Sequence, residues 1–147
     1  MTNSTVKNFS INATDVRKDW SNIVDTVVHK KPVFIKRTHD NIMMINSVSL
    51  SLFLEAYKFH IEIFREDDGS YTASVKEIDI ICNGPTKEVL IQNVITDLRD
   101  YASDYYEEFD YWYSSMNRKE HAPYVMKILL STDKQLMEAL ICHIGKN

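Results

Sequence analysis

Four basic side chains in the first part of the sequence are of the types that hold nucleic acid. Arg17 and Lys18 fall on the polar side of a predicted helix, near its start. Lys36 and Arg37 end a predicted strand. Arginine can bind guanine through two hydrogen bonds or hold a phosphate, while lysine mainly adds charge. Residues 1–60 carry eight Lys/Arg against five Asp/Glu, a balance of +3 that suits a polyanion. Taken alone, these charges are more typical of an ordinary solvated face.

Residues 99–113 combine aromatic and acidic side chains in a way that suits a protein partner. The segment holds seven aromatic and five acidic residues in fifteen positions. One helix face cannot bury all seven rings, so several should be exposed in a monomer, drawn from Tyr101, Tyr106, Tyr111 and Tyr113. Exposed tyrosine and tryptophan anchor protein interfaces, and the acids favour a basic partner. Packing inside a dimer, or against the last two helices, explains the rings equally well.

No group of residues has the spacing of a catalytic or metal site. The sequence lacks a glycine-rich phosphate loop, a His-Glu-x-x-His pair and a Gly-x-Ser-x-Gly turn. Asp67-Asp68 lie before Gly69-Ser70 between two predicted strands, so we interpret them as turn residues. Cys82 and Cys142 are predicted to be reduced thiols. We therefore expect no enzyme activity, no cofactor and no metal.

The first 60 residues predict the order strand, helix, hairpin, helix. A short strand covers residues 6–11, and Asn12 or Thr14 can cap a helix that runs to His29. Two apolar runs, 33–35 and 42–45, form a hairpin whose turn contains Asp40-Asn41. A second helix follows over residues 47–57. The apolar faces are too large for so small a unit to bury, so we expect an obligate dimer. The residues that form them are Val16, Trp20, Ile23, Val27, Phe34 and Ile45.

The second part predicts a three-stranded sheet followed by helices. Residues 59–64, 71–75 and 78–82 are the expected strands, and Asn83-Gly84-Pro85 ends the last of them. Thr86 can cap a helix that continues to Tyr113 with an apolar stripe at spacings of three and four. Pro123 suits the first turn of a short helix, and Thr132 to Gln135 has the spacing of a capping box for a last helix through Ile144. The predicted fold class is α+β.

Residues 7–57 resemble the Phd/YefM family of antitoxins from bacterial toxin–antitoxin operons. The resemblance lies in four segments: Phe9-Ser10-Ile11, Thr14 to Trp20, Lys31 to Arg37 and Ile42 to Ser47. It implies a dimer that binds the operator of its own operon, with Arg17 and Arg37 at positions that usually contact DNA. A glycine is missing from the hairpin, and Trp20 replaces the common leucine.

Residues 58–113 are similar to a HicB-like unit, a β-β-β-α module also known from antitoxins. The matching features are the alternating strand, Asp68-Gly69-Ser70-Tyr71, the third apolar run and the helix that opens at Gly84-Pro85-Thr86. An unrelated small α+β module also fits these features.

Together these patterns predict an antitoxin that neutralises a basic toxin and represses its own operon. Its predicted parts are a Phd/YefM-like dimerising unit (1–57), a HicB-like unit (58–115) and a C-terminal helical segment that binds toxin (116–147). The expected DNA contacts are Asn12, Thr14, Arg17, Lys18, Lys36 and Arg37. The expected toxin contacts are Tyr105, Phe109, Tyr111, Trp112, Tyr124, Leu129, Leu136 and Leu140.

We expect a homodimer or tetramer. We also expect a cytoplasmic protein, because the sequence has no signal-like N-terminus and no run of 18 apolar residues. The alternative is a transcriptional regulator or interaction protein without a toxin partner, and a gene for a basic protein beside this one would distinguish the two.

Overall fold

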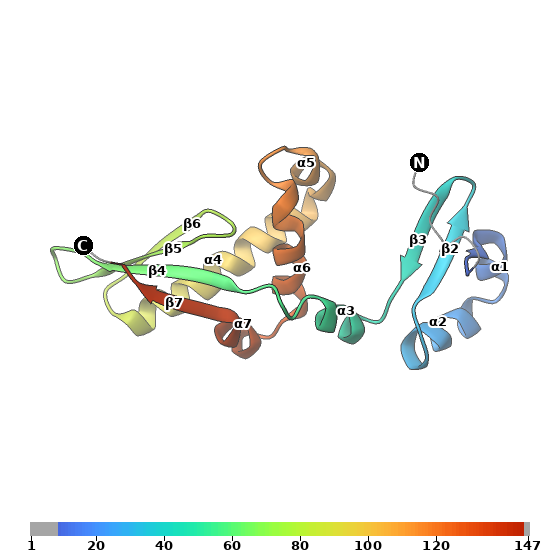
Figure 1. Cartoon of the computed structure of the whole chain (residues 1–147), viewed down its shortest axis with the longest axis horizontal. Helices are drawn as coiled ribbons and strands as arrows, with labels where there is room; N and C mark the ends of the chain where they lie inside the picture. Colours follow the sequence, from blue (N-terminus) through green and yellow to red (C-terminus); the bar gives the residue numbers. More distant parts are fainter. Residues whose placement is uncertain (1–8, 146–147) are drawn as a thin grey trace. The chain divides into compact units, whose positions relative to one another are not determined.

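The computed structural model describes residues 9–145, and the chain divides into two compact units between Leu52 and Phe53 (Figure 1). Residues 116–147 belong to the same unit as residues 58–115. The segment just after the boundary also belongs to the second unit, because the ring of Tyr57 lies edge-on to Tyr124 at 5.1 Å. The predicted α+β class is confirmed.

Unit 1 is a three-stranded sheet covered by two short helices. Strand β2 (Val33–Arg37) lies in the middle, parallel to β1 (Ile11–Asn12) and antiparallel to β3 (Asp40–Met44). Helices α1 (Ala13–Lys18) and α2 (Trp20–His29) pack on it, and α3 (Ser47–Phe53) follows the hairpin. Its small core consists of Val16, Ile23, Val27, Val33 and Ile35. The expectation that the unit cannot bury its apolar faces is therefore wrong for Val16, Ile23 and Val27; Phe34 and Ile45 are half-buried, and only Trp20 of the six residues is exposed.

The prediction of a single helix that ends at His29 is wrong, because Asp19 interrupts the helical conformation between α1 and α2. Asp19 has φ −123° and ψ 35°, outside the helical range, and it precedes the first residue of α2. The Asp19 side chain makes no capping hydrogen bond to the backbone of α2; its carboxylate accepts from the side chain of Asn22 at 3.4 Å instead. Asn12 is the residue before α1, but its side chain makes no capping hydrogen bond, and Thr14 lies inside the helix.

The turn of the hairpin in unit 1 lies two residues earlier than predicted. Asp40 and Asn41 belong to β3 and pair with Arg37 and Lys36. Thr38, rather than Asp40 or Asn41, takes the positive φ, at 54°. The strand pairing extends to Arg37 and Asp40, which leaves only Thr38 and His39 in the turn. Residues 6–8 of the predicted first strand lie outside the described residues.

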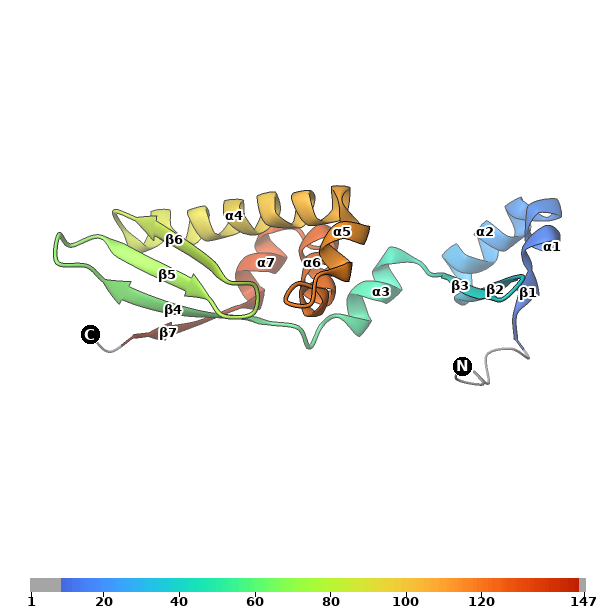
Figure 2. The same ribbon diagram turned by 90° about the horizontal axis from the view of Figure 1, so that it is seen from above.

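Unit 2 is a mixed sheet with helices packed on one face (Figure 2). Its strand order is β6-β5-β4-β7, with β4 (Phe59–Arg65) antiparallel to β5 (Tyr71–Val75) and parallel to β7 (Leu140–Ile144). Strand β6 (Ile80–Gly84) pairs antiparallel with β5. Phe59, Ile61 and Ile63 point from β4 into the core, as their alternation predicts.

The long helix of the prediction is two helices in the structure. Helix α4 (Lys87–Glu107) ends at Glu108, and α5 (Phe109–Ser114) begins directly after it. The predicted cap is confirmed, since Val89 N–H donates to Thr86 Oγ1 at 3.3 Å. The third strand begins at Ile80 instead of Ile78, because Asp79 turns the chain with φ 56°.

The predicted last helix stops early and becomes a strand. A 3₁₀ turn, η2 (Lys119–His121), precedes α6 (Ala122–Leu130), which has Pro123 in its first turn as predicted. Helix α7 (Asp133–Ala139) opens with the predicted capping box of Thr132 and Gln135. Leu140 to Ile144, predicted to be helical, form β7 because they find a partner strand in β4. Arg99 of α4 links α4 to the C-terminal end of α6 by donating to the carbonyl oxygens of Ile128 (2.7 Å) and Ser131 (2.7 Å).

Candidate nucleic-acid and partner-binding surfaces

Unit 1 brings two separate stretches of the sequence together at one end of its sheet. The register of β1 and β2 pairs Asn12 with Lys36, and Arg37 follows in β2. Helix α1, which carries Arg17 and Lys18, begins at the residue after Asn12. We call Asn12, Thr14, Arg17, Lys18, Lys36 and Arg37 the basic surface. Five of these residues are exposed and Lys36 is half-buried.

The cations of the basic surface are available to bind an anion. Among residues 9–145, the ion pairs of the structure involve none of Arg17, Lys18, Lys36 and Arg37. Asp40 stands opposite Arg37 in the hairpin without closing an ion pair within 4.0 Å. Arginine and lysine side chains without an internal partner can be redirected to an external phosphate at little cost.

Unit 2 exposes three of the tyrosines at the junction of α4 and α5. Tyr106 is 61% exposed, Tyr111 62% and Tyr113 43%, as predicted. Tyr101 is half-buried instead, and its hydroxyl lies 2.6 Å from His121 Nδ1. Beneath them Tyr105 is fully buried and donates its hydroxyl to the Arg118 carbonyl at 2.8 Å. Burial raises the pKa of both Tyr101 and Tyr105.

Exposed acidic residues neighbour the exposed tyrosines in the sequence at the junction of α4 and α5. Asp104, Glu107, Glu108 and Asp110 are all exposed on the same turns of α4 and α5. We call Tyr106, Tyr111 and Tyr113 with these four acids the aromatic–acidic surface. Residues 53–147 hold ten Lys/Arg against seventeen Asp/Glu, a balance of −7. The surface therefore combines flat apolar rings with negative charge.

Two cations of the chain itself already cover part of this aromatic region. The Arg118 guanidinium lies 6.0 Å from the ring centres of both Tyr101 and Trp112, and Lys119 Nζ lies 5.2 Å from that of Tyr113. Arg118 and Lys119 lie at the start of η2, and the sequence interpretation assigned them no role. The acidic and aromatic composition of residues 99–113 was the only signal that a cation should pack there.

The eight predicted toxin contacts do not form one surface. Tyr105 and Leu136 have no exposed surface, so a partner cannot touch them while unit 2 is folded. Phe109, Trp112, Tyr124 and Leu140 are half-buried against the core. Only Tyr111 and Leu129, 62% and 38% exposed, are open to a partner.

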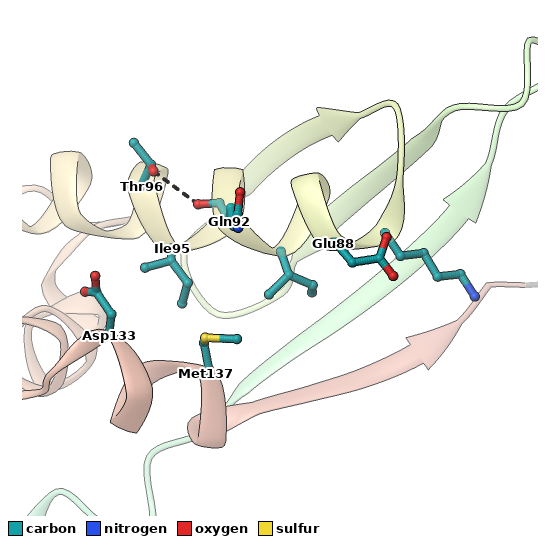
Figure 3. Close-up of a pocket in the computed structure, with 8 residues that line it drawn as sticks. Glu88, Gln92, Ile95, Thr96, Asp133 and Met137 are labelled. Atoms are coloured by element: carbon teal, nitrogen blue, oxygen red, sulfur yellow. Dashed lines mark hydrogen bonds between the residues drawn. The ribbon is translucent and has the colours of Figure 1, made fainter.

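A groove of about 660 Å³ lies between α4 and α7 in unit 2 (Figure 3). Ile95 and Met137 point into it from opposite sides, and the carboxylates of Glu88 and Asp133 stand at its two ends. Arg99 donates to Asp133 Oδ1 at 2.7 Å, so that carboxylate is already paired. The pKa of Glu88 is lowered by hydrogen bonds from its own backbone N–H and from Thr86. The remaining lining residues are Lys87, Ile91, Gln92 and Thr96.

The described residues contain no set of acids, histidines and cysteines that could hold a metal ion. The thiol of Cys82 is buried and donates to Asp97 Oδ2 at 2.8 Å, and burial raises its pKa to about 12. Such a thiol stays protonated and is a poor nucleophile. Among residues 9–145, no helix is both long and apolar enough to span a bilayer.

Comparison with known proteins identifies the class. The sequence profile of a family described as PHD_like, "Antitoxin of toxin-antitoxin, RelE / RelB, TA system", matches residues 8–143. This chain belongs to that antitoxin family. It is therefore a non-enzymatic regulatory protein whose partner is a toxin.

A solved structure agrees with the family assignment. The chain is similar to a crystal structure described as an antitoxin part of a putative toxin/antitoxin system from Syntrophomonas wolfei subsp. wolfei. The two are 32% identical with a TM-score of 0.87, over 92% of this chain and 99% of that one. Among curated proteins, no sequence matches significantly.

Proposed function

We propose that this antitoxin represses its own operon by binding operator DNA through the basic surface of unit 1. The observation that carries the proposal is the β1–β2 register, which places Asn12 beside Lys36 and so joins two basic stretches of the sequence. In a two-fold dimer each basic surface occurs twice, which suits a palindromic operator. Unit 1 is then the Phd/YefM-like part of the protein, and its strand, helix, hairpin and helix order supports this.

The proposed dimer forms through the exposed apolar residues of unit 1. Trp20 is 55% exposed, Val48 70% and Leu52 66%, although the buried core of this unit has only five residues. Helix α3 buries none of its residues. Apolar surface of this extent on so small a unit is typical of a face covered by a partner. A second copy is the occupant that a two-fold operator requires.

The proposed toxin contact is the aromatic–acidic surface of unit 2. Exposed tyrosines supply the apolar anchors, and the −7 balance of residues 53–147 favours a basic toxin. The sheet and α4 form the HicB-like part of this proposal. Because Arg118 and Lys119 already pack on neighbouring rings, the surface can hold cationic side chains. A protein that binds operator DNA acts in the cytoplasm, so a cytoplasmic location is part of this proposal.

Substitution of the two arginines tests DNA binding. Arg17→Ala and Arg37→Ala should each weaken binding to the DNA upstream of the gene by about 1–3 kcal/mol if the arginine contacts a base. Both side chains are exposed, so the fold should be unaffected. Gel-shift titration at fixed salt measures the affinity, with Lys134→Ala in α7 as the matched control.

Unchanged affinity in both arginine variants would remove the basic surface from the proposal. Co-expression with the product of the adjacent gene, followed by a pull-down, tests the toxin part separately. Failure to recover a complex there leaves the DNA result unaffected.

A further inference from the structure

Among the described residues, no strand pairs with the outer edge of β7 in the unit 2 sheet. Strand β7 is the last in the order β6-β5-β4-β7, with β4 on its other side (Figures 1 and 2). At the opposite edge, Asn93 of α4 donates to the Asn83 carbonyl of β6 at 2.8 Å. An open strand edge offers backbone groups to another strand, and proteins usually protect it with charges or proline.

The ladder between β4 and β7 fixes which backbone groups point to the open edge. Gly145 N–H donates to the Ile63 carbonyl at 2.8 Å. In a parallel pair, every second residue of a strand directs its backbone groups to the same neighbouring strand, so residues two and four positions before Gly145 also face β4. Ile141 and His143 therefore direct their backbone groups to β4. Cys142 and Ile144 direct theirs outward.

The side chains of β7 do not protect this edge. Its sequence is Leu-Ile-Cys-His-Ile, without lysine, arginine, acid or proline. Ile144 is 82% exposed and Ile141 37%, and Cys142 is an exposed free cysteine. Cys142 and Ile144, whose backbone groups point outward, thus also carry exposed side chains.

We propose that β7 pairs antiparallel with β7 of a second copy of this chain, about a two-fold axis at Cys142. In this register Cys142 faces its own copy, and because its N–H and carbonyl both point outward, the two cysteines exchange both hydrogen bonds. Leu140 faces Ile144 of the second copy, and Ile141 faces His143. All five residues are paired, and apolar residues meet at both ends.

The strand itself favours a second copy over another occupant. A register centred on Cys142 is the one in which residues 140–144 pair completely with themselves, and no like charges meet in it. One five-residue strand buries far less than the roughly 800 Å² per partner of a stable interface. The pairing therefore needs chains that are already associated, which raises their effective concentration. This step rests on the proposed dimer of unit 1.

Oxidative cross-linking of the full-length protein tests the pairing. Residues that exchange both hydrogen bonds in an antiparallel pair have Cα atoms about 5.5 Å apart, a separation that a disulfide can span. Copper-phenanthroline should therefore convert the wild type to a covalent dimer at micromolar concentration, whereas Cys142→Ser should give none. Buried Cys82 does not interfere.

Ile144→Lys distinguishes strand pairing from random collision. It removes two Leu–Ile pairs per dimer and should lower the cross-linking rate about tenfold. Ile144 is largely exposed, so unit 2 stays folded. The control is Ile81→Lys on β6, at a residue 69% exposed on the opposite edge, and it should cross-link like the wild type.

Hydrogen exchange of the Cys142 amide gives a measurement that does not depend on the thiol chemistry. The amide should be protected in the wild type and exchange rapidly in Ile144→Lys. Equal cross-linking of the two lysine variants, or a rapidly exchanging Cys142 amide, overturns the proposal. Protection that appears only after toxin is added also overturns it, because the edge then belongs to the toxin.

Sedimentation separates this proposal from the dimer of unit 1. A protein that sediments as a dimer but does not cross-link contradicts the strand pairing alone. A folded monomer that does not cross-link contradicts both proposals.

Discussion

At the scale of single residues, His121 shows how burial changes the chemistry of one group. It is the buried polar residue of the described core, 6% exposed, with the Tyr101 hydroxyl 2.6 Å from Nδ1. Burial lowers the pKa of His121, and the nearby charge of Arg118 lowers it further. The carboxylates of Asp79 and Glu120 act in the opposite direction with smaller effect. The folded protein therefore favours the neutral ring.

Unit 2 should lose stability on mild acidification because of His121. In the unfolded chain its pKa is near 6.5, above that in the folded chain. The contribution of neutral His121 to the stability of unit 2 is fully present above this pH. It is lost as pH falls through the lowered pKa of the folded state, because the unfolded chain takes up the proton more readily. Urea unfolding at about pH 7.5 and pH 5.5 measures the loss.

His121→Gln should reduce this pH dependence, whereas the same change at exposed His39 should not. An unaltered pH dependence in His121→Gln would assign the loss to the carboxylates instead.

Sequence patterns at the residue scale predict exposure better than contact. Arg17, Tyr106 and Tyr111 are exposed as expected, because charge and the limited width of a helix face decide it. Tyr105 and Leu136 were expected at an interface and lie in the core. An apolar stripe on a helix predicts burial, but it does not indicate whether the stripe packs against the same chain or against a partner.

At the scale of elements, Gly84 sets the distance between the sheet and α4 in unit 2. A Cβ atom built on Gly84 would lie 2.6 Å from the Leu90 backbone nitrogen and 2.7 Å from its Cα. Leu90 is fully buried in the first turns of α4, so its backbone cannot move aside easily. A side chain at position 84 must displace the helix from β6.

Gly84→Ala should therefore destabilise unit 2 by about 1–3 kcal/mol, the usual cost of overpacking a core. Chemical denaturation of the purified variant measures the change. Gly69→Ala is an informative contrast: its added Cβ meets no atom within 4 Å, but its φ of +88° is unfavourable for alanine. If Gly84→Ala matched the wild type, α4 and β6 would have to be further apart than the structure places them.

The elements that sequence predicted well are those defined by local signals. The capping box at Thr132 and the proline of α6 are local patterns, and both helices begin where expected. Strand β7 was missed because Leu140, Ile141 and Ile144 also fit a helical spacing. Only pairing with β4, about 80 residues away in the sequence, selects the strand. The helix interruptions at Asp19 and Glu108 were also missed, because the apolar residues keep a helical spacing across both positions.

At the scale of the whole molecule, the stability of unit 1 should depend on protein concentration. A dimer that covers Trp20, Val48 and Leu52 gains stability from association, so its Tm should rise with concentration. Leu52→Lys should weaken association, since burying one leucine contributes about 1.5–3 kcal/mol per chain. Sedimentation equilibrium measures the effect, with Ile81→Lys in unit 2 as the control. A stably folded monomer at micromolar concentration would contradict the dimer.

The toxin contact requires point substitutions rather than truncation. Deleting residues 114–147 would remove β7 and the buried residues Val125, Ile128 and Leu136, so unit 2 would lose part of its core. A loss of toxin binding in that truncation would not locate the contact. Exposed residues in two separate places allow a direct comparison: Tyr111 on the aromatic–acidic surface and Met137 in the groove, 62% and 53% exposed.

Tyr111→Ala should weaken binding of the toxin encoded by the adjacent gene by about 2 kcal/mol, the usual cost of losing an aromatic anchor. Met137→Ala should have little effect, because the groove lies outside the proposed contact. The acids around Tyr111 should act mainly on encounter, so added salt should lower the association rate more than it raises the dissociation rate. Surface plasmon resonance at two salt concentrations measures both rates. If Met137→Ala weakened binding and Tyr111→Ala did not, the toxin would bind the groove between α4 and α7 instead.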